Sequence, residues 1–158
     1  PDMVTMAKPL ANGFPIGAVL MRPHIAHAIA AGDHGTTFGG GPLTCRIAHH
    51  VLGRLGEPRL KEHIDSVSTY LFERLERISE AFSDMVSAPR GRGLIVGISM
   101  RSAPWAGEVV RLARERGVLF LTAGSDAVRF VPSLIVERAH IDEAMDVLES
   151  VLLVLRST

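Results

Sequence analysis

The chain is poor in lysine, cysteine and aromatic residues. Only two of its 17 basic residues are lysines, and aromatic residues make up 5% of its 158 residues. The single cysteine, Cys45, excludes a disulfide within the chain and fits a reducing compartment. Because Cys45 falls within a helix predicted over residues 42–55, we expect it to be a buried core thiol.

An excess of charge of either sign is also lacking. The 17 basic residues balance 17 acidic residues, so the formal net charge is zero. Proteins that bind nucleic acid or anionic membrane surfaces usually carry excess positive charge. No apolar run reaches the roughly 20 residues of a membrane-spanning helix, and the sequence does not open with a signal peptide. We therefore expect a soluble globular protein with neither nucleic acid nor a membrane as partner.

Motifs for metals and dinucleotides are missing as well. His24 with His27, and the pair His49–His50, have no third ligand at a suitable spacing, so we predict no metal site. The glycines near residue 93 do not keep the spacing of a dinucleotide-binding loop. We expect the segment Arg90–Gly93 to form a turn.

Lys8 follows the mostly apolar run Met3–Ala7. Desolvation disfavours the charged form of a lysine and lowers its pKa, which makes the amine a nucleophile able to form a Schiff base at neutral pH. The alternative is a lysine whose stem lies along apolar surface while its ammonium group stays in water. The sequence predicts a strand that ends at Lys8, a loop of fixed geometry and a second strand through Met21. The loop contains prolines, which restrict the backbone, and glycines, which relax it: Pro9, Gly13, Pro15 and Gly17.

A loop over Asp33–Leu43 is rich in glycine and contains Thr36 and Thr37. The helix that follows begins at Pro42, a residue that suits the first helical turn. Free amide groups, the positive end of the helix and two hydroxyls would together bind a phosphate. The alternative is an ordinary glycine-rich loop in which a threonine caps the helix.

Arg129 lies in a strand among Val128, Phe130 and Val131 that we expect to be mostly buried. A buried arginine needs an anionic partner, and its planar guanidinium suits a carboxylate. That carboxylate belongs either to a substrate or to an acidic residue of the chain.

The segments around Lys8, Thr37 and Arg129 resemble those of the class III, or ω-type, pyridoxal-phosphate (PLP) aminotransferases. The resemblance implies that Lys8 forms a Schiff base with PLP and that Arg129 binds the α-carboxylate of the substrate. It also implies a homodimer with shared active sites, in which Thr37 contacts the phosphate of the cofactor held by the other subunit. Thr36 is a second candidate for that contact. The chain departs from many relatives at Gly41, where they carry asparagine.

The segment Leu121–Gly124 is most similar to the acetylornithine branch of that family. This similarity implies transfer of an amino group between N2-acetylornithine and 2-oxoglutarate, a step of arginine biosynthesis. The partners would be a small-molecule amino donor and a 2-oxo acid. Ornithine, γ-aminobutyrate and other ω-aminotransferases remain alternatives, as does a catalytically inactive structural or interaction fragment. The compartment would be the mitochondrial matrix in a eukaryote and the cytoplasm in a bacterium.

The fold implied by the resemblance is the α/β, type I fold of PLP-dependent transferases. Residues 1–55 would be the C-terminal end of the large PLP-binding domain, 56–84 a long connecting helix, and 85–158 the small C-terminal α/β domain. The chain begins almost directly with a strand whose sequence predicts burial, and enzymes of this family have several hundred residues. We therefore expect the chain to be a C-terminal fragment.

Apolar periodicity supports this organisation. Apolar residues that recur alternately three and four positions apart predict one long amphipathic helix. They are Leu60, Ile64, Val67, Leu71, Leu75, Ile78 and Phe82. The sequence also predicts helices over residues 24–31 and 104–116, a strand over 93–100, two strands around Arg129 and a final helix with apolar positions from 141 to 155.

Overall fold

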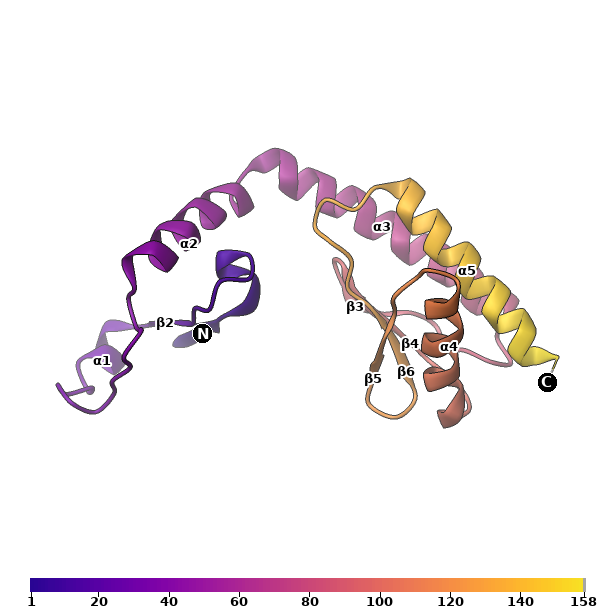
Figure 1. The fold of residues 1–158 in the computed structure, drawn as a ribbon, viewed down its shortest axis with the longest axis horizontal. Helices are drawn as coiled ribbons and strands as arrows, with labels where there is room; N and C mark the ends of the chain where they lie inside the picture. The colour runs from indigo at the N-terminus through magenta and orange to yellow at the C-terminus, as the bar shows by residue number, and fades with distance from the viewer. Residues whose placement is uncertain (158) are drawn as a thin grey trace. The chain divides into compact units, whose positions relative to one another are not determined.

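The structure, a computed structural model, describes residues 1–157 (Figure 1). It divides into two compact units, unit 1 comprising residues 1–58 and unit 2 beginning at Arg59. Each unit has its own cluster of buried side chains. No helix among the described residues has the length and apolar character needed to cross a membrane.

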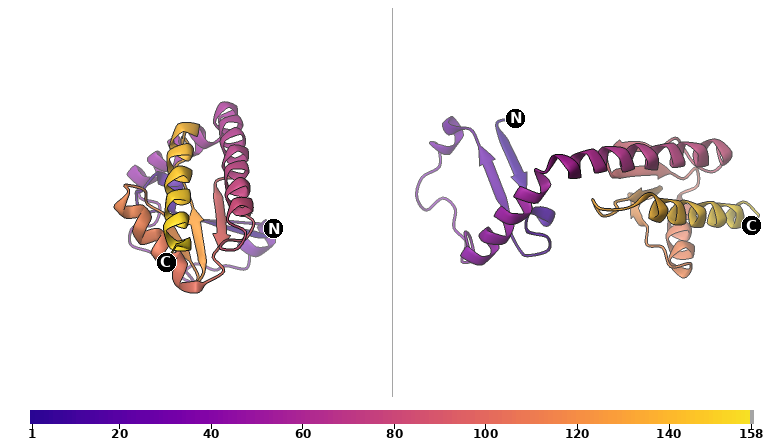
Figure 2. Two further views of the ribbon diagram at one scale, coloured as in Figure 1. Left: turned by 90° about the vertical axis from the view of Figure 1, so that its right-hand side faces the viewer. Right: turned by 90° about the horizontal axis from the view of Figure 1, so that it is seen from above.

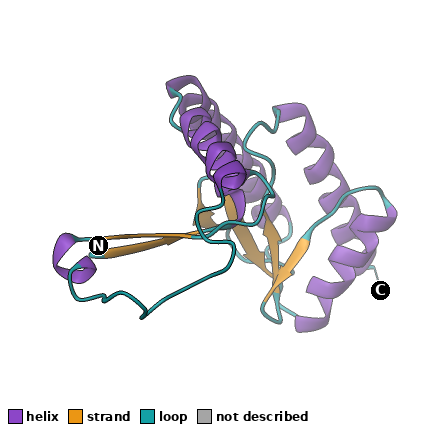
Figure 3. Cartoon of the chain, turned by 60° about the vertical axis from the view of Figure 1, so that its left-hand side comes forward, coloured by secondary structure: helices purple, strands orange, loops and turns teal. Residues whose placement is uncertain are grey.

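Unit 1 is built on a two-stranded antiparallel sheet (Figure 3). Its strands are β1 (Met3–Met6) and β2 (Ala18–Met21), and a 3-10 helix η1 (Lys8–Ala11) follows β1. Helix α1 (Pro23–Ala26) is a single short turn, and α2 (Pro42–Leu55) has the bounds that its sequence predicts. Proline at the first position of α2 supplies a helical φ and lacks only an amide hydrogen that would have no partner there.

The helix predicted over residues 24–31 is wrong in its second half. The chain leaves the helix after Ala26, and the amide of Ala30 donates instead to the carboxylate of Asp33 at 2.7 Å. Aspartate side chains that accept from nearby amides compete in this way with helical hydrogen bonds.

The expectation that the first strand is buried is also wrong in this structure. Met3 is 49% exposed and Val4 39% exposed, and on the partner strand Leu20 is 59% exposed. A two-stranded sheet has too little surface to build a core of its own. The buried residues of unit 1 lie elsewhere, where Leu10 and Ala11 of η1 pack against Ala48 of α2.

Three helices of unit 2 cover its sheet. They are α3 (Pro58–Ala81), α4 (Ala103–Glu115) and α5 (Arg138–Arg156). Helices α3 and α5 lie side by side in both views of Figure 2. Helix α5 begins at Arg138, where the amide of Glu137 donates to Nδ1 of His140 at 3.3 Å.

The sheet of unit 2 has four antiparallel strands in the order β3, β4, β6, β5. Their bounds are Arg90–Arg92 for β3, Ile95–Ser99 for β4, Leu121–Ala123 for β5 and Ala127–Phe130 for β6. The turn expected over Arg90–Gly93 is therefore wrong, because its first three residues pair with β4. Gly91 has φ of 149°, and a Cβ there would collide with the carbonyl oxygen of Ile95, so this strand depends on glycine and carries no ordinary strand signal.

The apolar stripe of α3 forms one wall of the main core. Val67, Leu71, Leu75 and Ile78 are buried, as their spacing predicts, and Phe82 is buried just beyond the helix. Residues of β4, β6 and α5 complete this core: Val96, Ile98, Val128, Phe130, Met145, Leu148 and Leu152. Burying such a side chain stabilises a fold by about 1.5–3 kcal/mol, so this core holds the sheet that carries Arg129.

Candidate functional site

Lys8 starts the η1 turn in an unusual backbone conformation. Strand β1 ends at Met6, Ala7 is extended, and Lys8 has φ of 52°. Lys8 and Asn12 are the non-glycine residues with positive φ among residues 1–157. A left-handed conformation of a non-glycine residue costs on the order of 1–3 kcal/mol and concentrates at functional sites.

Packing directly after Lys8 holds it in this conformation. Leu10 is 6% exposed and Ala11 is fully buried against α2. The amide of Leu10 donates to the carbonyl of Ala7 at 3.3 Å, and that of Asn12 donates to Pro9 at 3.1 Å. The lysine therefore stands at the exposed start of a turn whose other end is fixed.

The Lys8 side chain is exposed, and its amine has no hydrogen bond or ion pair among the described residues. The apolar run before it suggested a desolvated amine, and in this structure that suggestion is wrong because residues 1–157 do not bury it. A cavity of about 250 Å³ is lined by Thr5–Pro9, which include Lys8. The Lys8 side chain is therefore open to solvent in this structure.

Thr36 and Thr37 are both exposed in the loop before α2. Thr36 lines a cavity of about 350 Å³ together with Gly17 and Gly41, whereas Thr37 is not among the residues that line it. The loop folds tightly over Thr36, because a Cβ at Gly39 would collide with the Thr36 methyl group. Helix α2 has Gly41 as its N-cap and no side-chain cap, so the alternative in which threonine caps the helix is wrong.

Thr44 and Cys45 line the same cavity from the first turn of α2. The expectation of a buried Cys45 is wrong, because this thiol is exposed. Ala48 is the one buried residue of α2, and Ile47 beside it is partly buried. The helix therefore packs against η1 through a narrow face. The sequence analysis did not identify Thr44. Its position in the first helical turn after the glycine-rich loop was the signal that could have pointed to it.

Arg129 lies on β6 between two buried residues, Val128 and Phe130. Its own side chain is exposed, because successive residues of a strand point to opposite faces. The expectation of a buried arginine is therefore wrong, and no acidic side chain among residues 1–157 pairs with it. A cavity of about 140 Å³ with mostly apolar lining, including Leu121 and Val136, adjoins it.

The predicted site residues are distributed over both units. Lys8 and Thr36 belong to unit 1, where they line separate cavities, and Arg129 belongs to unit 2. The histidine pairs His24 with His27 and His49–His50 do not join a metal-binding group, since the described part of the chain has no cluster of three or more suitable side chains.

Comparison with known proteins supports one family. The sequence profile of the family Aminotransferase class-III matches residues 1–152. An acetylornithine aminotransferase, mitochondrial, from Neurospora crassa is 44% identical over 149 residues, which cover 94% of this chain and 32% of that protein. The chain thus spans about a third of the length of the relatives it matches.

Solved structures agree with the sequence comparison. The N-acetylornithine aminotransferase from Stenotrophomonas maltophilia matches with a TM-score of 0.85 and 34% identity, over 99% of this chain and 41% of that chain. An ornithine aminotransferase from Toxoplasma gondii, in which PLP partially occupies the active site, matches with a TM-score of 0.89 and 28% identity, over 99% and 37%. The chain belongs to the class III aminotransferases, a family of PLP-dependent enzymes with the type I transferase fold.

Proposed function

We propose that the whole protein to which this chain belongs transfers an amino group between N2-acetylornithine and 2-oxoglutarate, with PLP as cofactor. The observation that carries this proposal is Lys8, an exposed lysine in a left-handed conformation just after β1, without a partner among the described residues. The similarity to acetylornithine aminotransferases supports the choice of substrate.

The residues of unit 1 fit the chemistry of PLP, which carries an aldehyde and a phosphate. Lys8 offers an amine without a partner among residues 1–157. Thr36 and Thr44 offer hydroxyls beside the first turn of α2, where helix geometry leaves amide groups unpaired. Lys8 would serve the cofactor of its own subunit, and the hydroxyls before α2 would serve the phosphate of the cofactor held by a second subunit.

In the proposed reaction, Nζ of Lys8 would hold the cofactor covalently in the resting enzyme. Once the amino donor had displaced it, the same nitrogen would take the proton from the substrate carbon that bears the amine and pass it to the cofactor. PLP supplies an electron sink for the charge that develops on that carbon. The turn at Lys8 would fix the backbone from which Nζ reaches the cofactor.

Thr37 and Thr36 would bind the phosphate of the cofactor held by a second subunit. Both are exposed and lie in the loop that precedes α2. This arrangement requires a homodimer with shared active sites. Arg129 would bind the α-carboxylate of the substrates, since its guanidinium is exposed and has no partner in the described part of the chain.

The domain organisation forms part of this proposal. Residues 1–55 would complete the large PLP-binding domain, 56–84 would connect the domains, and 85–158 would form the small domain. The compartment would be the mitochondrial matrix in a eukaryote, as the name of the Neurospora relative indicates for that protein, and the cytoplasm in a bacterium.

An ornithine aminotransferase is the second candidate, because the Toxoplasma ornithine enzyme is also a structural match. γ-Aminobutyrate and other ω-amino donors are further candidates within the same chemistry. The 158-residue chain alone, when separated from the rest of the protein, would be a structural or interaction fragment without activity.

An assay of the whole protein with a panel of amino donors tests the proposal. We expect N2-acetylornithine to give the highest kcat/KM with 2-oxoglutarate as acceptor. Lys8→Ala should abolish turnover, whereas Lys61→Ala, which alters the other lysine of the chain, should not. A preference for ornithine or γ-aminobutyrate would replace the substrate assignment, and turnover by Lys8→Ala would refute the mechanism.

A further inference from the structure

A left-handed residue stands at each end of the η1 turn. Lys8 opens the turn with φ of 52°, and Asn12 closes it with φ of 49° and ψ of 45°. Asparagine adopts this conformation more readily than most residues, whereas a long side chain such as lysine adopts it only at a cost. The conformation of Lys8 is therefore one that its surroundings must enforce.

The chain is held on both sides of Lys8. Before it, Met6 of β1 pairs with Ala18 of β2. After it, Leu10 and Ala11 are buried against α2. A strained backbone conformation persists only where the surrounding structure over-determines it. A change that frees the buried pair would therefore let Lys8 relax to an ordinary conformation.

Asn12 ends the turn directly after its buried part. The amide of Asn12 donates to the carbonyl of Pro9 at 3.1 Å, and the amide of Phe14 donates to the carbonyl of Ala11 at 3.2 Å. A left-handed residue in this place stops a helical turn and redirects the chain. Gly13, with φ of 102°, continues the change of direction. Ala11 therefore stays buried where the chain leaves η1.

The backbone of Asn12, rather than its side chain, makes this contribution. The side chain is exposed and forms no hydrogen bond among residues 1–157. Glycine accepts the left-handed conformation as asparagine does, whereas alanine disfavours it. With a right-handed residue at position 12, the chain would leave η1 along another path, and the turn that begins at Lys8 would reorient.

We propose that Asn12 is a positioning residue for Lys8, because its left-handed backbone closes η1 and so keeps Lys8 in the conformation from which Nζ reaches the cofactor. This proposal rests on the proposed function and extends it to a residue that does not touch the reacting atoms. Asn12 follows Lys8 by roughly 8 Å along a 3-10 turn, so a rotation of the turn displaces Nζ directly. A displacement of about 1 Å at a reacting group can slow a reaction about 100-fold.

Comparison of Asn12→Ala with Asn12→Gly in the whole protein tests the proposal. Two quantities are measured: the rate at which the cofactor-free protein captures PLP on Lys8, followed by absorbance and by trapping with borohydride, and kcat per mole of bound PLP. We expect Asn12→Ala to lower both about tenfold and to leave KM for 2-oxoglutarate within about twofold. Asn12→Gly should keep both quantities within about twofold of the unaltered protein, because glycine retains the left-handed backbone.

Gly117→Ala is the matched control for a loss of stability. Gly117 belongs to unit 2, has φ of 84° just after α4, and a Cβ there meets no atom within 4 Å. Alanine at this position therefore disfavours the native backbone without a collision, as it does at position 12. The variant should lower the melting temperature but leave PLP capture and kcat per bound PLP within about twofold.

Three results would overturn the proposal. The first is that Asn12→Ala captures PLP and turns over as the unaltered protein does. The second is an equal loss in Asn12→Gly, which would show that the side chain matters rather than the backbone. The third is an equal loss in Gly117→Ala, which would show a general effect of stability. In each case the unaltered protein would still hold PLP on Lys8, so the proposed function would stand, whereas failure of the unaltered protein to capture PLP on Lys8 would refute both.

Discussion

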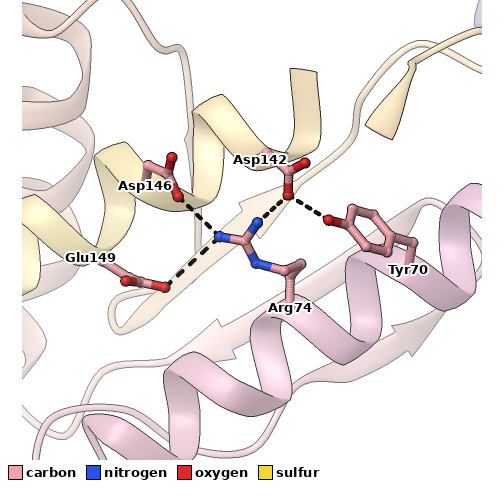
Figure 4. Close-up of polar contacts among 5 residues, drawn as sticks. All are labelled: Tyr70, Arg74, Asp142, Asp146 and Glu149. Carbon is pink, nitrogen blue, oxygen red and sulfur yellow. Dashed lines mark hydrogen bonds and ion pairs between the residues drawn. The ribbon is translucent and has the colours of Figure 1, made fainter. Parts of the chain in front are cut away.

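The guanidinium of Arg74 in α3 forms an ion pair with the carboxylate of Asp142 in α5 (Figure 4). The hydroxyl of Tyr70 donates to the same carboxylate at 2.6 Å, and Arg74 also reaches Asp146 at 3.0 Å. Burial by itself would lower the pKa of Arg74, but its contacts with Tyr70 and Asp146 and the charge of Asp142 raise it above the ordinary value. The arginine therefore remains charged and joins two helices that cover the sheet.

Replacement of Arg74 by methionine should destabilise unit 2. The Arg74 side chain is only 15% exposed, whereas its acidic partners are more exposed and regain water when it is removed. We expect a loss of about 1–3 kcal/mol in the free energy of unfolding. Urea unfolding followed by fluorescence of Trp105, the only tryptophan of the chain, measures it.

Arg77→Met is the matched control for this change. Arg77 lies on the same helix, is exposed, and has no ion pair among the described residues. We expect its replacement to change the free energy of unfolding by less than about 0.5 kcal/mol. Similar losses in the two variants would mean that the Arg74 contacts contribute nothing specific.

The ion pair between Arg156 and Asp84 should make stability depend on acid pH. The hydrogen bond from Arg156 lowers the pKa of Asp84 below its ordinary value in the folded chain. Asp84 therefore binds a proton more readily in the unfolded chain, so its stabilising contribution is present above the unfolded pKa and is lost as pH falls through the folded pKa.

Comparison of the unaltered chain with Asp84→Asn tests this dependence. Between about pH 5 and about pH 3, the free energy of unfolding should fall less steeply in the variant, because one carboxylate with a lowered pKa has been removed. Equal slopes in the two proteins would show that the contact with Arg156 does not persist in solution.

Gly91→Ala should disrupt the β3 strand. Gly91 has φ of 149°, and an added Cβ would collide with the carbonyl oxygen of Ile95. We expect a loss of about 1–3 kcal/mol in stability. Gly107→Ala in α4 is the control, because a Cβ there meets no atom within 4 Å, and alanine stabilises a helix interior by up to about 1 kcal/mol. A neutral Gly91→Ala would mean that the hairpin tolerates another path.

Much of the helical structure could be predicted from the sequence because its signals are local. Pro42 sets the start of α2, and the spacing from Leu60 to Phe82 reports the buried face of α3. Strand β3 gave no such signal, because the glycine that its geometry requires is a residue usually found in turns.

The identities of the candidate site residues could also be predicted, but their surroundings could not. Lys8 and Arg129 stand out by residue type in an apolar context. Alternation in a strand shows that Arg129 faces away from Phe130, but it does not show which of these two faces the helices cover. The left-handed conformation of Lys8 depends on packing of Leu10 and Ala11 against α2, a contact between residues distant in sequence.

The most direct test of the account is to locate PLP in the whole protein. After reduction with borohydride and proteolysis, mass spectrometry of the peptides should place the mass of the cofactor on Lys8 alone. The Lys61→Ala variant should retain this adduct, and Lys8→Ala should lose it. A cofactor adduct on Lys61, or on a lysine outside this chain while Lys8 stays unmodified, would contradict the central role assigned to Lys8.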